Sequence, residues 1–323
     1  MKTKFGIFLL AACASAFAVD DYRFLGPTEL QDSFLPTQLR YQAYPESART
    51  LAKGDWRVEV TVDWSNDLAE TGTYLFDGET ITHTLKIRQS PAKHWEFGFD
   101  VPYTRRIDGV ADEFIEFVET TLNAKVDARY QLPRDSYNSY IAGPNGTVLT
   151  FRKASSFQDA TLRAKYQFLD VNEGDCVDMA AVGTFTIPTG GENFGGHGVS
   201  PGVGVHLQKP LSKHYNLFIG GAGNYYTNSR EQLFKFDELR GMGYLGAESR
   251  WAWFGLAAMY QVYTPFAPQN APLNASAHYY SVMGRFYLGR NVTFETGVVE
   301  NLGQFDNRNS TDVTFKFSLA AHF

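Results

Sequence analysis

Residues 56–64 read WRVEVTVDW, a stretch in which apolar and polar side chains alternate without interruption. A period of two places the two kinds of side chain on opposite faces of a β-strand. The apolar face begins and ends with tryptophan, at Trp56 and Trp64, and the polar face carries charges of both signs. The chain ends on the same pattern, because residues 312–323 read DVTFKFSLAAHF. Both stretches therefore predict strands with one apolar and one polar face.

Twelve stretches of this kind, some of them alternating less cleanly, predict strands at residues 55–66, 78–89, 93–104, 157–169, 176–188, 198–209, 215–226, 239–250, 254–263, 278–288, 291–301 and 312–323. Short turns alternate with longer connections rich in Gly, Asn, Asp and Pro, at residues 66–77, 104–156, 188–197, 227–238, 264–277 and 302–311. This alternation is typical of outer-membrane barrels, whose strands of about 10 residues span the hydrocarbon layer. We therefore predict an all-β fold, a transmembrane antiparallel up-and-down β-barrel of about 12 strands. An even strand number places both termini at the short-turn end, in the periplasm.

A soluble β-sandwich or a lipocalin-like barrel is the alternative, because its strands also alternate. Two features favour the membrane. Aromatic residues lie at strand ends as well as in the middle of strands, as the aromatic girdles of membrane barrels require. The last strand ends on Phe323, which resembles the C-terminal signature recognised by the barrel-assembly machinery. We therefore expect that machinery and outer-membrane lipid as partners of a monomeric barrel.

The first 18 residues combine a basic start, an apolar run and a small-residue cleavage site ending at Ala18, which predicts a signal peptide. Residues 19–54 contain Pro27, Pro36 and Pro45 and do not alternate, so they predict an N-terminal arm before a barrel at 55–323. Residues 10–13, LAAC, also resemble the lipobox of lipoproteins, in which Cys13 would be acylated. We predict location in the cell outer membrane under either alternative.

The composition argues against several functions. The 323 residues include 29 Lys+Arg and 35 Asp+Glu, and the formal net charge of −6 disfavours nucleic acid as a partner. The seven His residues are scattered without a zinc motif, and GGENFGG at 190–196 precedes neither a lysine nor a helix. We therefore expect no cofactor and no metal, and we expect Cys176 to be inert.

The polar faces of the predicted strands point into the barrel. An Arg or Lys facing hydrocarbon would cost about 2–4 kcal/mol at the midplane, whereas inward charges of both signs can pair with one another. These charges predict either a rigidly filled interior or an electrostatic constriction that selects a solute. The candidates are Arg57, Glu59, Asp63, Lys86, Arg88, Glu96, Asp100, Asp159, Arg163, Lys165, Glu248, Arg250, Arg285, Glu295 and Lys316.

Three further features bear on the lumen. The arm at 19–54 is long enough to plug it from the periplasm. Residues 108–122 are acidic with apolar residues at three- and four-residue spacing, which predicts a helix in the longest loop that could fold over the mouth or cap it without gating. Small inward residues suggest a slot along one wall, at Ala180, Thr184, Thr186, Gly202, Gly204, Gly220, Ala222, Gly255 and Ala257.

Four stretches resemble an uncharacterised domain-of-unknown-function family of Gram-negative outer-membrane barrel proteins, at residues 36–60, 105–123, 185–207 and 309–323. The third, FTIPTGGENFGGHGVSPGVGVHL, is also similar to the outer-membrane proteins of meta-pathway phenol degradation, which are regarded as transport proteins. This resemblance implies a barrel that passes a small molecule, and it implies no catalytic residue.

The sharpest enzyme hypothesis is an outer-membrane phospholipase, which needs a serine activated by a histidine on a lipid-facing strand edge. The nearest match, His197 and Ser200, has opposite parity in an extended chain and lacks the Asn-Gly that follows in such enzymes. We therefore predict a non-enzymatic channel or transporter for a small solute, with an aromatic or amphipathic molecule as one possible solute. The alternative is a non-conducting, plugged barrel with a role in envelope structure or surface binding.

Overall fold

The computed structural model describes the chain from residue 24 onward, except for residues 72–73, 111, 123–135, 143–147, 192, 197, 228–236, 266, 268–272, 290 and 302–311. The predicted signal peptide and Cys13 lie outside the described residues. Among the described helices, none combines the length and the apolar character needed to cross a membrane.

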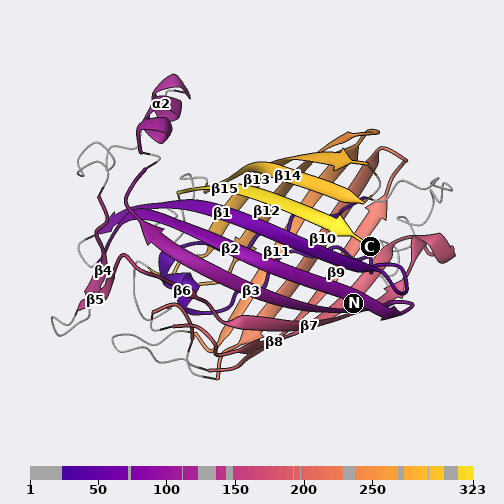
Figure 1. Ribbon diagram of the computed structural model, residues 1–323, viewed down its shortest axis with the longest axis horizontal. Coiled ribbons are helices and arrows are strands. Elements are labelled where there is room, and N and C mark those ends of the chain that lie inside the picture. Colours follow the sequence, from indigo (N-terminus) through magenta and orange to yellow (C-terminus); the bar gives the residue numbers. More distant parts are fainter. Residues whose placement is uncertain are drawn as a thin grey trace, which may run out of the picture.

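A closed antiparallel barrel forms the body of the protein (Figure 1). Its strands are β1 (Trp56–Thr71), β2 (Tyr74–Ala92), β3 (Trp95–Ile107), β7 (Ala160–Leu169), β8 (Asp178–Ile187), β9 (Ser200–Pro210), β10 (Tyr215–Tyr225), β11 (Leu239–Arg250), β12 (Phe254–Tyr263), β13 (Ala277–Leu288), β14 (Val292–Asn301) and β15 (Val313–His322). Each strand pairs with the next, and β1 pairs with β15 to close the sheet. The twelve predicted strands and the barrel are confirmed.

The two ends of the barrel differ. At the short-turn end the first and last strands meet, where Trp56 and Phe323 exchange backbone hydrogen bonds of 3.0 and 2.9 Å. The opposite, long-loop end carries the short strands β4 (Ser139–Ala142), β5 (Val148–Phe151) and β6 (Ser155–Phe157), and the helix α2 (Asp112–Leu122). Figure 1 shows β4, β5 and α2 far from the C-terminus, at the other end of the barrel.

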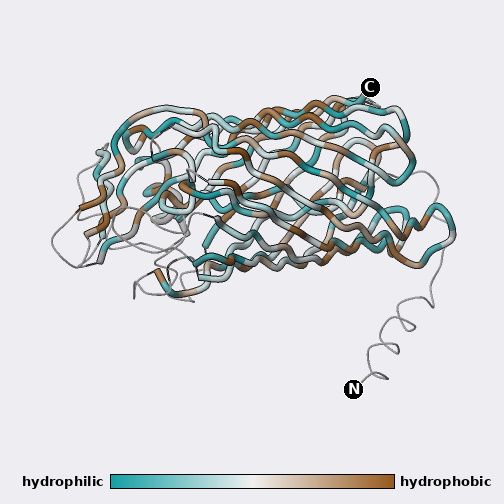
Figure 2. The backbone as a smooth tube through the Cα atoms, turned by 90° about the horizontal axis from the view of Figure 1, so that it is seen from below, coloured by the Kyte–Doolittle hydropathy of each residue, from teal (hydrophilic) through white to brown (hydrophobic). Residues whose placement is uncertain are grey.

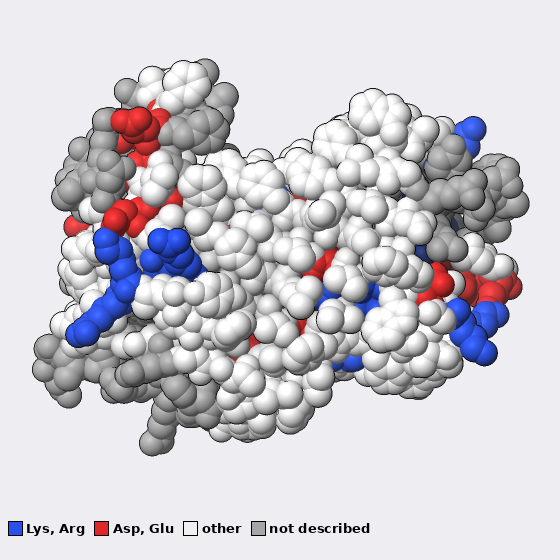
Figure 3. Space-filling view, in the orientation of Figure 1, with Lys and Arg blue, Asp and Glu red and all other residues white. Residues whose placement is uncertain are grey.

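Alternation decides which side chains face outward. Along the strands in Figure 2, hydrophobic and hydrophilic residues follow one another. On the face seen in Figure 3, most of the barrel surface is uncharged, and the largest groups of charged side chains lie toward the ends. On the strands, the faces predicted to meet lipid carry exposed apolar residues, among them Val60, Phe97, Leu162, Val205, Val282 and Leu319.

Two predicted loops are partly strand. The connection expected at 66–77 is wrong for most of its length, because β1 and β2 remain paired up to Thr71 and Tyr74. The inward face changes there from charged to aromatic, since Tyr74 and Phe76 are buried at the long-loop end. The pattern of charged inward residues that marks the membrane-spanning part therefore ends before the two strands do. The second, 104–156, contains β4, β5 and the start of β6.

The helix predicted within 108–122 is confirmed as α2, whereas its expected place at the mouth is wrong. Ile115 packs in a cluster with Val313, Trp64, Val298 and Phe315. Because Trp64 and Phe315 belong to the outward faces of β1 and β15, the described part of α2 lies against the outer wall. It therefore does not cover the lumen.

The facing assignment predicts opposite outcomes for two neighbouring substitutions. Val60 is 49% exposed on the outer wall and Thr61 is 0% exposed inside. We expect Val60→Arg to impair membrane assembly, because a lipid-facing arginine costs about 2–4 kcal/mol at the midplane, and Thr61→Arg to be tolerated beside acidic groups. The measurement is the yield of folded barrel in lipid vesicles, and equal yields would show that the assignment is wrong.

Candidate functional site

The predicted inward charges lie inside the barrel. Eleven of the residues predicted to line the lumen are buried: Glu59, Lys86, Arg88, Glu96, Asp100, Arg163, Lys165, Glu248, Arg285, Glu295 and Lys316. Three are half-buried: Arg57, Asp63 and Arg250. The fifteenth, Asp159, is buried and accepts hydrogen bonds from the backbone N–H groups of Gly190 and Gly196 at 2.9 and 2.7 Å, so it holds the glycine-rich loop.

Within the wall, charged side chains pair with one another, both within a strand and between strands. Arg285 of β13 lies 2.6 Å from Glu295 of β14 and 2.9 Å from Glu248 of β11. The Lys316 ammonium lies 3.1 Å from Asp63. Remaining pairs are Arg57–Glu59 and Arg88–Asp100 at 2.5 Å and Lys165–Glu96 at 3.0 Å. Arg250 instead lies over the Tyr287 ring, 3.9 Å from its centre.

The arm occupies the space between these walls. Its outbound limb, residues 24–33, begins near the short-turn end, where the Leu25 and Gly26 N–H groups donate to Glu248 at 3.2 and 2.9 Å. It ends at the long-loop end, where Asp32 lies 2.8 Å from Arg240 at the start of β11. The outbound limb therefore crosses the length of the lumen.

The arm turns at a buried 3₁₀ helix, η2 (Leu35–Leu39). Pro36 favours the start of such a turn because its φ is fixed and it needs no donor there. Asp32 accepts the Phe34 N–H at 3.1 Å, and the Thr37 hydroxyl donates to the Phe34 carbonyl at 2.7 Å. Phe34, Leu35 and Leu39 pack in one apolar cluster with Tyr74, Phe76, Ile141, Leu149, Phe151, Ala267 and Leu273. We call this cluster the apex site.

The return limb, residues 40–51, runs back to the short-turn end. The Tyr44 hydroxyl donates to Asp100 at 2.6 Å, and Glu46 lies 2.7 Å from Arg163. Arg49 pairs with Asp178 of β8 at 2.6 Å, and the Leu51 N–H donates to Glu96 at 3.0 Å. The arm thus enters and leaves through the same end and forms a hairpin inside the barrel.

The two sides of the lumen differ in chemistry. The inward faces of β10–β14 and the arm share an apolar cluster that contains Leu30, Ala43, Phe218, Met242, Tyr244, Ala257, Met259, Tyr263, Ala277, Tyr279, Met283 and Val299. The inward faces of β1, β2, β3 and β7 present hydroxyl, carboxyl and ammonium groups instead. The arm packs against the apolar side, where Ala43 donates its N–H to Asn224 at 2.8 Å. Wall side chains take the space beside two glycines of the predicted slot, Asn224 at Gly202 and Tyr244 at Gly220.

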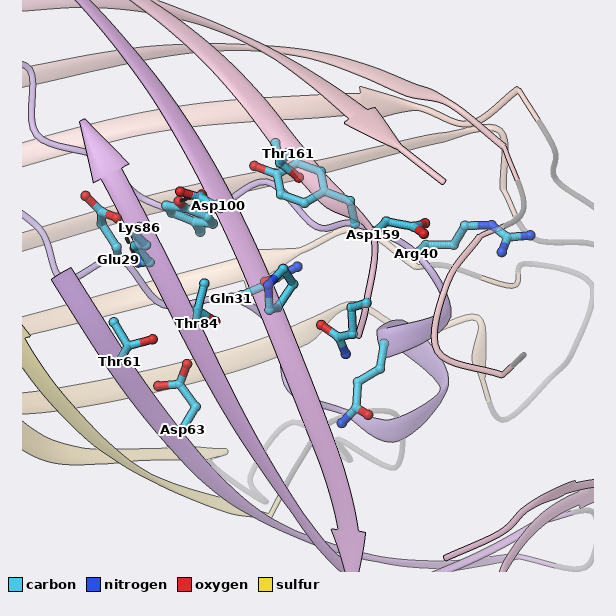
Figure 4. Close-up of a pocket in the computed structure, with 15 residues that line it drawn as sticks. Glu29, Gln31, Arg40, Thr61, Asp63, Thr84, Lys86, Asp100, Asp159 and Thr161 are labelled. Carbon is cyan, nitrogen blue, oxygen red and sulfur yellow. Dashed lines mark hydrogen bonds and ion pairs between the residues drawn. The ribbon is translucent and has the colours of Figure 1, made fainter. Parts of the chain in front are cut away.

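A cavity remains on the polar side, between the arm and β1, β2, β3 and β7 (Figure 4). The cavity is small, with a volume of about 30 Å³, enough for a few water molecules. Figure 4 shows Glu29 and Lys86 together at one end and Arg40 and Asp159 at the other. The hydroxyl of Thr61, which lines this cavity, is buried without a hydrogen-bond partner among the described residues. The cavity thus offers polar groups to a solute.

Sequence reasoning missed the arm's own charged residues, Glu29, Asp32, Glu46 and Arg49. The arm has no alternation, so its pairing could not be assigned. A signal was present in the charge balance of the wall, because the fifteen residues predicted to point inward comprise eight cations and seven carboxylates. An excess of buried cations requires carboxylates from elsewhere, and Glu29 and Glu46 supply them.

One cluster of ligand-type side chains lies at the short-turn end. Ligand atoms of His94, Asp170 and Glu173 lie within 4.8 Å of one another. Lys93 forms an ion pair with Glu173, and its hydrogen bond lowers the pKa of that carboxyl. A lysine ammonium therefore already occupies the place that a cation would take. Cys176 is half-buried in the same turn region.

The enzyme hypothesis gains no geometric support. Ser200 is buried on the inward face of β9, whereas a lipid-modifying nucleophile must face the bilayer. Its predicted partner His197 lies outside the described residues.

Solved structures share this fold. The COG4313 outer membrane channel from Pseudomonas putida F1 matches with a TM-score of 0.60 at 11% identity, over 87% of this chain and 100% of that chain. The P. putida toluene transporter TodX has a TM-score of 0.41 at 8% identity, over 85% and 91% of the two chains. The CymD monoaromatic hydrocarbon channel has a TM-score of 0.40 at 9% identity, over 84% and 88%. The first of these similarities shows the outer-membrane barrel fold. The TM-scores of the other two are too low to support a statement about this chain.

Comparison with the curated proteins finds no match. The family comparison is decisive, because it covers nearly the whole length. Residues 7–323 match the family described as "Protein of unknown function (DUF3187)", and the chain belongs to this family.

Proposed function

We propose that this barrel is an outer-membrane channel for a small solute and that the arm at residues 24–54 restricts its lumen. One observation carries the proposal. The arm traverses the lumen twice and is bonded to opposite walls through side chains, at Glu248 and Arg240 on the way out and at Asp100 and Asp178 on the return. It enters and leaves at one end, so it can shift without threading through a closed ring.

The two-sided lumen supports an amphipathic solute. Three of the chain's five methionines lie on the apolar side together with tyrosine rings. Methionine and aromatic side chains adapt to flat or irregular apolar groups. The opposite side carries paired charges and hydroxyls, which would orient a polar end. The charges predicted from the sequence would then act as the selectivity residues of the channel.

The test is single-channel recording in planar bilayers. We compare the full-length mature chain with a chain that lacks residues 19–54, after showing that both fold as barrels. We expect small or rare conductance steps from the first and larger, frequent steps from the second. Block of these currents by amphipathic and aromatic solutes would then identify the class of solute.

A second candidate is a non-conducting barrel with a structural or binding role. The number of buried ion pairs between the arm and the wall favours it, because such pairs can serve to rigidify an interior. Silence from both folded chains would support this candidate and exclude the channel.

We further propose that the protein is a monomer with both termini in the periplasm. The final strand, ending on Phe323, would be read by the barrel-assembly machinery. Phe323 is exposed at the short-turn end, where such contact is possible.

A further inference from the structure

A second cavity lies beside the arm near the short-turn end. It has a volume of about 20 Å³ and is bounded by the start of the arm and by β1, β13, β14 and β15. Its lining includes Leu25, Arg57, Glu295 and His322. His322 is the last residue of β15, so this cavity reaches toward the barrel's short-turn opening.

The two cavities lie in series beside the outbound limb of the arm. The first is the cavity of Figure 4, which extends from Glu29 to Asp159 near the long-loop end. The second continues from Glu29 toward His322. Among the residues that the structure describes, Glu29 is the one that lines both. Two polar cavities therefore lie in series beside the arm, and the Glu29 side chain separates them.

Ion pairs hold Glu29 in the blocking position. Its carboxylate lies 2.8 Å from Lys86, 3.8 Å from Arg57 and 3.7 Å from Arg88. Its side chain is only 12% exposed. A glutamate side chain can change rotamer without backbone movement, and such changes are fast compared with the release of a segment.

The rest of the arm is held independently of Glu29. Glu46 on the return limb pairs with Arg163 and Lys165 at 2.7 and 3.5 Å, and Arg49 pairs with Asp178. The apex site holds Phe34 among apolar residues. Movement of the Glu29 side chain would therefore leave the arm in place.

We propose that solute passes through these two cavities while the arm stays in the lumen, and that Glu29 is the gate between them. This inference rests on the proposed channel function and adds its route and its gating residue. Glu29 also determines whether the channel prefers anions or cations. With Glu29 removed, Arg57 and Lys86 line the passage with one carboxylate fewer, so anions are favoured.

The experiment records single-channel currents of the full mature chain in asymmetric KCl. Glu29→Gln keeps the side-chain shape and removes the charge that the three cations hold. We expect a severalfold larger conductance and a reversal potential shifted toward that of chloride. The double variant Glu29→Gln/Arg57→Gln restores the charge balance, so its reversal potential should return toward the wild-type value.

Glu46→Gln is the matched control. It removes the same charge from the same arm and takes one carboxylate partner from Arg163 and Lys165, which keep Asp100 and Glu96, but Glu46 lines neither cavity. We expect a wild-type reversal potential from it. Equal effects of Glu29→Gln and Glu46→Gln would overturn the gate, because they would indicate a loosened arm.

The remaining outcomes separate this inference from the channel function itself. An unchanged Glu29→Gln channel, with larger currents from the chain lacking residues 19–54, would overturn the gate and leave the channel function standing. Silence from every folded variant, including that chain, would overturn both.

Discussion

Replacing Phe34 with aspartate is expected to expel the tip of the arm from the apex site and to open the lumen. Phe34 is 0% exposed and packs edge-to-face on Phe76, with 5.1 Å between ring centres. Removing a buried phenylalanine side chain costs about 3–5 kcal/mol. A carboxylate in an apolar site adds several kcal/mol more. Phe34 takes no part in the backbone hydrogen bonds between the barrel strands, so the arm should move while the strands remain paired.

Two measurements check this. Arg40 is buried in the wild-type protein, so trypsin should not cut after it until the arm leaves the lumen. We expect rapid cleavage there in Phe34→Asp, together with a large increase in single-channel conductance. Phe117→Asp is the control, because Phe117 is 67% exposed on α2. A protected Arg40 and unchanged currents in Phe34→Asp would show that the apex site does not hold the arm.

The barrel could be predicted from the sequence because the alternation of apolar and polar residues is a local pattern. In WRVEVTVDW each residue's face follows from its parity, and an error of one residue would place every charge in lipid. The same parity rule correctly predicts that Arg285, Lys316 and the carboxylates beside them point into the lumen. It also correctly predicts Thr61 inside and Val60 outside.

The arm could not be placed in this way. Pro27, Pro36 and Pro45 cannot donate to a sheet ladder, so residues 24–54 adopt no periodic structure that a pattern could reveal. The bonds of Glu29 and Asp32 join positions separated by 57 and 208 residues in the chain. Side-chain contacts of this range depend on the finished barrel. The extension of β1 and β2 was missed for the same reason, because Tyr74 and Phe76 face the arm and not water.

Arg285→Met is expected to destabilise the barrel more than any other single substitution in its wall. Arg285 is 1% exposed and contacts three elements. Its guanidinium pairs with Glu295 and Glu248, and it donates to the Thr28 hydroxyl at 3.1 Å. Methionine fills much of the volume but leaves two buried carboxylates without a cation. Breaking a buried pair in this way costs about 3–5 kcal/mol.

The measurement is urea unfolding of the barrel in detergent or lipid, where the midpoint should fall markedly. Arg105→Met serves as the control, because Arg105 is exposed and such substitutions usually change stability by less than about 0.5 kcal/mol. A wild-type midpoint for Arg285→Met would show that the two carboxylates do not depend on this cation.

The triple variant Arg285→Met/Glu248→Gln/Glu295→Gln separates charge from packing. If unpaired charge causes the loss, neutral amides should recover most of the stability, since uncharged replacements of buried ion pairs are often tolerated. The two carboxylate oxygens of Glu248 also accept the Leu25 and Gly26 N–H groups, and the single glutamine oxygen can still accept one of them. We therefore expect the triple variant to recover its midpoint with the start of the arm still in place. A triple variant as unstable as Arg285→Met alone would assign the loss to packing and to the Thr28 bond.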